Sequence, residues 1–255
     1  MALSKLSGDE QCIVFSQLCN VLDARIAVAF SSTNSELRTL TQALLQQLRA
    51  DHEVAAALGR KVGMRSCKEL REARLVIWSR YGYGLGLSAA DLGTLGKLGS
   101  VLPALKDLTL IEPAAGPDGV QRLAEGLAAG ALPSVAQISL ISFHVGDAGA
   151  SALAAALGRG AMPRLQSLDL SRTSMGDAGL VALAPALRRR PALTSLTLTG
   201  NPFGDKGLAA LVAPPQPAAG ALPPLAKLML LDLDDTQVSD AGCAALSSAL
   251  NSGTL

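Results

Sequence analysis

One apolar pattern returns five times in the second part of this 255-residue chain. In each copy an apolar residue is followed by others three and five positions later, and by a glycine fourteen positions later. The copies begin at Leu105, Val135, Leu165, Leu193 and Leu228, and their glycines are Gly119, Gly149, Gly179, Gly207 and Gly242. Similarity at a nearly regular interval of about 30 residues is typical of an array of repeated structural units.

Within each copy the spacing of the apolar residues changes. The third copy reads MPRLQSLDLSRTSMGDAGLVALAPAL, residues 162 to 187. Leu168 and Leu170 stand two apart, which is the spacing of one face of a β-strand. Gly179, Leu183 and Leu187 stand four apart, which is the spacing of one stripe of an α-helix. Each copy is therefore predicted to form a strand followed by a helix.

A single strand–helix unit has too few buried aliphatic positions to offset the entropy lost when its backbone is ordered. Stacked units share their apolar rows and so supply the missing burial. The sequence thus predicts an α/β fold, a curved solenoid with a parallel sheet inside and helices outside, preceded by a small all-α segment. In this scheme residues 102–255 form five repeats, residues 70–101 form a degenerate first repeat, and residues 1–69 form the helical segment.

An aspartate stands two positions before the repeat glycine in four copies, at Asp147, Asp177, Asp205 and Asp240. A carboxylate at a helix start can accept the free N–H groups of the first turn and interacts favourably with the helix dipole, for about 1 kcal/mol each. We expect each aspartate to cap its own helix, and each glycine to let that helix approach its strand. Because the aspartates fall one per repeat, we do not expect a metal-binding cluster.

The repeat motif L-x-x-L-x-L-x-x-N/T-x-hydrophobic-x-x-x-G-x-x-x-L-x-x-x-L resembles the leucine-rich repeat of the ribonuclease-inhibitor type, over residues 102–255. The resemblance implies a protein that captures a protein partner on the concave side of its sheet. The asparagine typical of that family is present only as Asn201, with Thr173 and Thr236 in its place in two other copies. We expect less regular turns in the first two copies.

The N-terminal run LSGDEQCIVFSQL, residues 6 to 18, resembles an F-box. Members of that family dock a short helical module onto the adaptor of cullin-type ubiquitin ligases, which implies adaptor contacts by Leu6, Val14, Phe15 and Leu18. The usual proline after the first leucine is Ser7 here. Residues 1–69 are therefore either an F-box-like module of a ubiquitin-ligase substrate receptor or a plain helical cap.

Composition excludes several classes of partner. The chain has 22 Lys+Arg against 21 Asp+Glu, so it lacks the cationic surplus that nucleic-acid binding needs. We expect no membrane partner either, because no apolar run reaches the roughly 18 residues of a membrane span. The four cysteines, Cys12, Cys19, Cys67 and Cys243, form no closely spaced pair and are predicted to be reduced thiols of a cytoplasmic or nuclear protein.

Catalysis is not expected from this sequence. It has two histidines. His52 lies in the charged stretch LRADHEVA and is predicted to be solvated, and His144 is predicted to lie in a loop. Neither is near a Ser or Cys in a motif that would activate a nucleophile. We predict a non-enzymatic protein without a cofactor.

The outward-facing residues of the predicted strands are rich in hydroxyls, apolar at one end and acidic at the other. Such a surface suits a protein partner with a basic patch. The predicted contact residues are Thr109, Ser139, Asp169, Thr197, Asp232 and Asp234 on the strands, Arg172 at the rim, and Trp78, Tyr81 and Tyr83 in the run WSRYGY. That run either contacts the partner or packs at the N-terminal edge of the solenoid. Repeats of this type also form the activating protein of the Ran GTPase, which the resemblance makes the alternative function.

Overall fold

The structure is a computed structural model that describes residues 7–33, 35–79, 86–111, 115, 118–213, 225 and 227–253. The chain divides into two compact units, Met1–Glu72 and Ala73–Leu255. The first is called the helical unit below, and the second is called the repeat unit.

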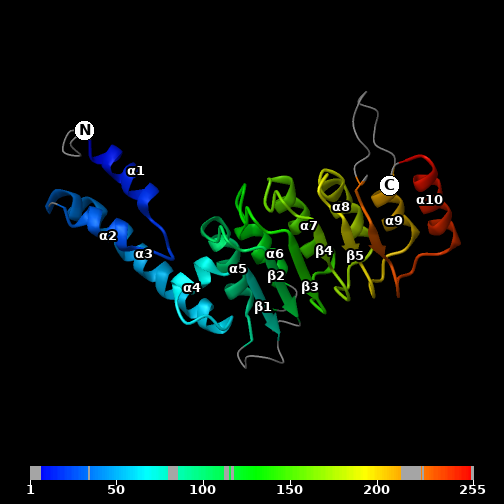
Figure 1. The fold of residues 1–255 in the computed structure, drawn as a ribbon, viewed down its shortest axis with the longest axis horizontal. Coiled ribbons are helices and arrows are strands. Elements are labelled where there is room, and N and C mark those ends of the chain that lie inside the picture. Colours follow the sequence, from blue (N-terminus) through cyan, green and yellow to red (C-terminus); the bar gives the residue numbers. More distant parts are fainter. Residues whose placement is uncertain are drawn as a thin grey trace. The chain divides into compact units, whose positions relative to one another are not determined.

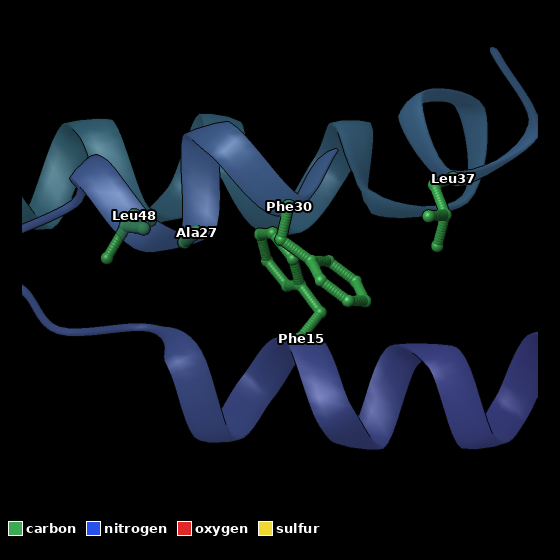
Figure 2. Packing of buried hydrophobic residues seen from close by; sticks show 5 residues of the cluster. All are labelled: Phe15, Ala27, Phe30, Leu37 and Leu48. Carbon is green, nitrogen blue, oxygen red and sulfur yellow. The ribbon is translucent and has the colours of Figure 1, made fainter. Parts of the chain in front are cut away.

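The helical unit is built around one small apolar core. Its helices are α1 (Gly8–Leu18), α2 (Arg25–Ser31), α3 (Ser35–Lys61) and α4 (Cys67–Glu72). Figure 2 shows the buried side chains that α1, α2 and α3 contribute: Phe15, Ala27, Phe30, Leu37 and Leu48. The rings of Phe15 and Phe30 pack with their centroids 6.2 Å apart. These three helices therefore depend on one another for burial.

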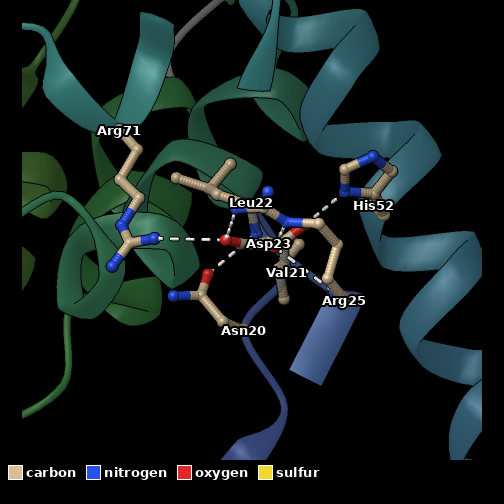
Figure 3. Close-up of polar contacts among 7 residues, drawn as sticks. All are labelled: Asn20, Val21, Leu22, Asp23, Arg25, His52 and Arg71. Atoms are coloured by element: carbon tan, nitrogen blue, oxygen red, sulfur yellow. Dashed lines mark hydrogen bonds and ion pairs between the residues drawn. The ribbon is translucent and has the colours of Figure 1, made fainter. Parts of the chain in front are cut away.

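Asp23 holds the turn between α1 and α2. Its Oδ1 accepts a hydrogen bond from Nε of Arg25 at 2.8 Å, and its Oδ2 lies 3.6 Å from Nη1 of Arg71 on α4 (Figure 3). The hydrogen bond from Arg25 is the main reason why the pKa of the Asp23 carboxyl lies well below its usual range. The ionised carboxylate thus links the turn to the last helix of this unit.

In the repeat unit, strands and helices alternate along the chain (Figure 1). The strands are β1 (Leu75–Ser79), β2 (Asp107–Ile111), β3 (Gln137–Ile141), β4 (Ser167–Asp169), β5 (Ser195–Thr197) and β6 (Leu230–Asp232). The helices are α5 (Ala89–Leu98), α6 (Asp118–Gly126), α7 (Gly146–Gly158), α8 (Asp177–Arg188), α9 (Asp205–Val212) and α10 (Asp240–Asn251), and a short 3-10 helix, η2 (Gly99–Val101), follows α5.

The six strands form one sheet in chain order, and every neighbouring pair is parallel. Equivalent positions of successive repeats lie opposite one another, as in the row Leu108, Ile138, Leu168 and Leu196, whose side chains are buried. The predicted α/β solenoid of stacked strand–helix units is confirmed. The shared leucine rows form its core.

We expected each repeat aspartate to cap its own helix, but three of the four cap the helix of the next unit. Oδ1 of Asp147 accepts hydrogen bonds from the backbone N–H groups of Gly176 and Gly179, at 2.8 and 2.9 Å. Asp177 binds Gly204 and Gly207 in the same way, and Asp205 binds Ser239 and Gly242. The hydrogen bonds from Ser239 lower the pKa of Asp205. Each of these carboxylates therefore joins two units.

This contact also explains the repeat glycine in the later units. A Cβ on Gly179 would lie 2.6 Å from Oδ1 of Asp147, and a Cβ on Gly207 would lie 2.8 Å from Oδ1 of Asp177. The glycine was expected to bring the helix close to its own strand. Instead it leaves room for the carboxylate of the preceding unit.

Arginines of the following unit bind carbonyl groups at the C-terminal ends of two helices. Nη2 of Arg159 donates to the carbonyl oxygens of Ala124 and Leu127, just at and beyond the end of α6. Arg190 donates to carbonyl oxygens of Leu157, Ala161 and Met162, at the end of α7 and in the turn after it. A cation is favourable at the negative end of a helix dipole. Helices α8, α9 and α10 thus receive an acidic cap from the unit before, whereas α6 and α7 receive a basic cap from the unit after.

We predict that Asp177→Ala destabilises the repeat unit by about 1–3 kcal/mol, because two backbone N–H groups lose a charged acceptor. The matched control is Asp240→Ala, since Asp240 stands at the same repeat position but has no hydrogen bond or ion pair with any other described residue. Urea unfolding followed by circular dichroism measures both. Equal losses of stability in the two variants would contradict the capping role.

Helices α5 and α6 pack closely because both carry glycines at their contact. A Cβ on Gly126 would lie 2.8 Å from the carbonyl oxygen of Gly93 and 2.9 Å from the backbone nitrogen of Lys97. Both contacts are with backbone atoms, which cannot move aside as a flexible side chain can. The two helices must therefore separate to accept any side chain at this position.

We predict that Gly126→Ala destabilises the repeat unit by about 1–3 kcal/mol, the usual cost of overpacking. Gly158→Ala on α7 is the control, because a Cβ there would meet no atom within 4 Å. In that variant the higher helix propensity of alanine is expected to stabilise by up to about 1 kcal/mol. Thermal unfolding of the three proteins distinguishes these outcomes, and an unchanged melting temperature for Gly126→Ala would show that the helices are not in close contact.

Candidate functional site

The strands present one side to the helices and leave the other partly exposed. Side chains such as Val76, Leu108 and Leu110 point toward the helices and are buried. The alternate positions form rows across the sheet, because equivalent residues of neighbouring strands are paired. The middle row is Ile77, Thr109, Ser139, Asp169, Thr197 and Asp232. This side of the sheet is called the open sheet face below.

The end of this face at β1 is apolar. Leu75 is 48% exposed and Ile77 is 49% exposed, which is unusual for aliphatic side chains on a sheet. Ile111 and Ile141 lie on the next two strands and are partly exposed. Sequence reasoning did not single out Leu75 and Ile77. Strict alternation along β1 was the signal that could have found them.

The other end of the open sheet face is acidic. Asp169 and Asp232 lie opposite Thr197, one on each side of it, and both are partly exposed. Asp169 accepts hydrogen bonds from the backbone N–H and the hydroxyl of Ser171, so its carboxylate is held in one orientation. Asp232 accepts a bond from the N–H of Asp234, whose own side chain is exposed. The carboxylates are therefore fixed in place and accessible.

Arg172 lies at the end of β4 and is exposed. Its φ is 55°, and its backbone N–H donates to the carbonyl of Thr199 at 2.8 Å. A Cβ on Gly200 would lie 2.7 Å from Cγ of Arg172, so the arginine stem lies over that glycine. The guanidinium is thus held at the rim of the face beside the acidic end.

Two of the predicted contact residues are not accessible. Trp78 is only 1% exposed, because strand alternation turns it toward the helices, and its indole N–H has no hydrogen-bond partner in the described part of the chain. Ser139 points toward the open face but is 5% exposed, since its short side chain lies between Thr109 and Asp169 on the neighbouring strands. Both predictions are corrected. Tyr81 and Tyr83 lie outside the described residues, whereas Thr109 and Thr197 are partly exposed as expected.

The predicted adaptor-binding residues serve mainly as core. Phe15 is fully buried, and Val14 and Leu18 are partly buried against the same cluster. Phe15 therefore cannot contact an adaptor while the helical unit is folded as observed, and that prediction is corrected. Leu6 lies outside the described residues. Among the described side chains of α1 and α2, the most exposed aliphatic ones are instead Ile13, at 63%, and Ile26, at 60%.

His52 was expected to be solvated, but the structure places it in a packed environment. It is partly buried, and its Nδ1 lies 2.6 Å from the carbonyl oxygen of Val21, to which Nδ1–H donates because a carbonyl oxygen can only accept (Figure 3). Its Nε2 lies 3.9 Å from Sγ of Cys67. Burial raises the pKa of the Cys67 thiol, which disfavours the reactive thiolate. This pair therefore resembles a packed structural contact more than an activated nucleophile.

No group of three or more His, Cys, Asp or Glu side chains is placed to hold a metal ion in the part of the chain that the structure describes. Among the helices of those same residues, none is both long enough and apolar enough to span a bilayer.

Comparisons with known proteins agree with the repeat architecture. A family profile described as "Leucine Rich repeat" matches residues 162–184 and 191–212, which are the third and fourth copies. No curated protein matches the chain. The third and fourth copies thus match leucine-rich repeats, and the ribonuclease-inhibitor type stays a prediction.

Two solved structures resemble the chain at low sequence identity. Leiomodin-1 actin-binding site 2 is 16% identical, with 64% of this chain and 87% of that chain covered and a TM-score of 0.44. Internalin C2 from Listeria monocytogenes is 18% identical, with 77% and 88% covered and a TM-score of 0.37. The assignment of the fold therefore rests on the stacked units of this chain and on the matched repeats.

Proposed function

We propose that the open sheet face binds a protein partner that presents apolar side chains to β1–β3 and basic side chains to β4–β6. Leucine-rich repeats generally mediate protein–protein interactions, and such solenoids use their extended sheet face for this purpose. The observation that carries the proposal is the pair of half-exposed aliphatic residues, Leu75 and Ile77, at one end of a row that ends in carboxylates.

The two ends contribute differently to binding. Covering a half-exposed leucine or isoleucine gains roughly 1 kcal/mol each, so the apolar end supplies affinity. Partly exposed carboxylates supply less affinity but increase the rate of encounter with a basic partner and set its orientation. The partner is therefore expected to bind more slowly at high salt, with a smaller change in its dissociation rate.

The test is affinity capture from the source cells with quantitative mass spectrometry. We predict that Ile77→Asp and Asp232→Lys each reduce capture of the same protein at least about tenfold, because each reverses the chemistry of one end. Val181→Asp is the control, since Val181 is 37% exposed on α8 and does not lie on the sheet. If neither Ile77→Asp nor Asp232→Lys changes the set of captured proteins, the open sheet face is not the binding surface.

The F-box resemblance would make the helical unit an adaptor-docking module and the protein a ubiquitin-ligase substrate receptor. The exposed Ile13 and Ile26 would then be the contact residues, since Phe15 is internal. We predict that Ile13→Asp abolishes co-purification of the cullin-ligase adaptor without unfolding the helical unit, which circular dichroism checks. Absence of the adaptor from wild-type preparations would exclude this role.

The alternative function is activation of a GTPase, as in the Ran-activating protein that the repeat resembles. The observation that favours this function is the acidic charge at one end of the open sheet face. Either role fits a non-enzymatic scaffold. We propose that the protein is located in the cytoplasm or nucleus, in accord with the free thiols of Cys19, Cys67 and Cys243.

A further inference from the structure

The C-terminal ends of helices α5 to α8 lie at one edge of the repeat unit, because each helix runs back between two parallel strands (Figure 1). These helix ends and the turns after them occupy residues 97–105, 121–135, 155–165 and 185–193. In these four segments the only carboxylate is that of Glu125. The surface that they form is called the basic edge below, and its exposed cations are Lys97, Arg122, Arg159, Arg164 and Arg189.

Hydrogen bonds show that these cations follow one another from unit to unit. Arg159 donates to carbonyl oxygens at the end of α6, and Arg190, next to Arg189 in the chain, donates to carbonyl oxygens at the end of α7 and after it. Packed helices lie about 8–10 Å apart. Positive charge therefore recurs along the basic edge at about that interval.

Most of these cations have no partner within the described part of the protein. The side chains of Lys97, Arg122, Arg164 and Arg189 make no hydrogen bond or ion pair with any other residue that the structure describes. A helix dipole favours a cation in the last turn of its helix. Arg164 lies in the turn beyond α7, outside the reach of that effect. The capping of helices thus does not account for the whole row.

The net charge of the chain conceals the basic edge. The whole sequence has 22 Lys+Arg against 21 Asp+Glu. In the repeat unit, however, many of the acidic residues lie at the opposite edge, where the helices begin, as Asp118, Asp147, Asp177 and Asp205 do. Separated charges of this kind create a local positive potential that attracts an anionic partner.

One end of the basic edge is hollowed. A groove of about 440 Å³ lies between α5 and α6, and its lining includes Gly93 and Gly126, which lack side chains, together with the cations Lys97 and Arg122. Glu125 also lines it, so the groove has two cations against one carboxylate. A side chain of a partner protein can enter this groove and place a carboxylate beside the cations.

The surroundings favour an acidic protein segment over a nucleic acid or a membrane. Single-stranded nucleic acids stack on exposed aromatic side chains. The described aromatic residues of the repeat unit, Trp78, Phe143 and Phe203, are at most 2% exposed. Binding to a bilayer surface uses apolar side chains beside the cations. None of the described residues in the four segments presents an exposed large apolar side chain.

We propose that the basic edge binds an extended acidic segment of a partner protein, with a carboxylate at about every third residue and one acidic side chain seated in the groove between α5 and α6. An extended chain rises about 3.3 Å per residue, so three residues span the interval from one helix to the next. Arginine binds a carboxylate through two parallel hydrogen bonds, which suits the exposed arginines of this row.

The probe is a labelled peptide of about twelve residues with glutamate at every third position and glycine or serine elsewhere, long enough to reach from α5 to α8. Fluorescence anisotropy with the full-length protein is expected to show saturable binding that weakens as salt rises. The control peptide has the same composition with its glutamates adjacent. We expect it to bind at least about threefold more weakly, because fewer of its carboxylates reach a cation at once. Equal affinities of the two peptides would overturn the proposed spacing.

Two variants of the protein test the location. Arg164→Glu and Arg189→Glu each change an exposed side chain without contacts, and each is expected to weaken the spaced peptide about fivefold or more. Lys206→Glu is the matched control, because Lys206 is exposed in the first turn of α9 at the opposite edge and the change in net charge is the same. We expect it to weaken binding by less than about twofold. Equal losses in the three variants would show that only net charge matters and would overturn the proposal.

Cross-linking locates the peptide directly. Carbodiimide joins a glutamate carboxylate to a nearby lysine amine, and mass spectrometry identifies the lysine. We expect the spaced peptide to be joined to Lys97 and not to Lys206. Cross-links at Lys206 alone would place the peptide at the wrong edge and contradict the proposal.

The other two classes of partner are further outcomes of the test. A single-stranded oligonucleotide of the same charge and vesicles that contain phosphatidylserine are measured beside the peptide. We expect both to bind more weakly than the spaced peptide. If either binds more tightly and loses affinity with Arg189→Glu, the basic edge serves that class of partner and the proposal is wrong.

This proposal does not depend on the open sheet face. Ile77→Asp removes the apolar end of that face and leaves the basic edge unchanged, so it should not affect the affinity for the peptide. If Ile77→Asp weakens the peptide as much as Arg189→Glu does, the peptide binds the open sheet face and the basic edge is not its site.

Discussion

The strand–helix units of this protein depend on their neighbours for their cores and, from α6 onward, for a helix cap. The leucine rows of one unit are buried only when the next unit covers them, as the gradient from Leu196 to Leu231 illustrates. The first N–H groups of α8, α9 and α10 find their acceptors in the preceding unit, and carbonyl groups at the ends of α6 and α7 find arginines in the following one. The contacts that stabilise the repeat unit therefore lie between successive strand–helix units.

This dependence leaves the sheet surface free for another purpose. Because the helices and the inward rows provide the burial, the outward side chains of the strands contribute little to stability and can vary in chemistry from one strand to the next. The open sheet face accordingly changes from aliphatic at Leu75 and Ile77 to acidic at Asp232. The same dependence makes the last unit different from the others, since its inward row and its aspartate meet no further unit among the described residues.

The repeat could be predicted in detail because its signal is periodic and local. Alternation placed the strands and their register, and the spacing of four placed the helices. The errors share one cause, which is that a sequence does not state which neighbour a side chain meets. Asp177 was assigned to its own helix and binds the next one. Trp78 was named as a partner contact and faces the helices, and Phe15, an adaptor contact in the F-box resemblance, fills a core. His52 was expected in water and is bonded to the carbonyl of Val21 across the helical unit.

The sequence by itself determined the order of strand and helix within each repeat and which residues form the inward rows, because these follow from spacing along one chain. The tertiary structure alone decided that carboxylates and arginines act between units, that Ser139 is covered by its neighbours, and that Leu75, Ile77 and Asp240 remain accessible. Accessibility and capping depend on the distance between residues about 30 positions apart, and only the stacking of the units brings such residues together.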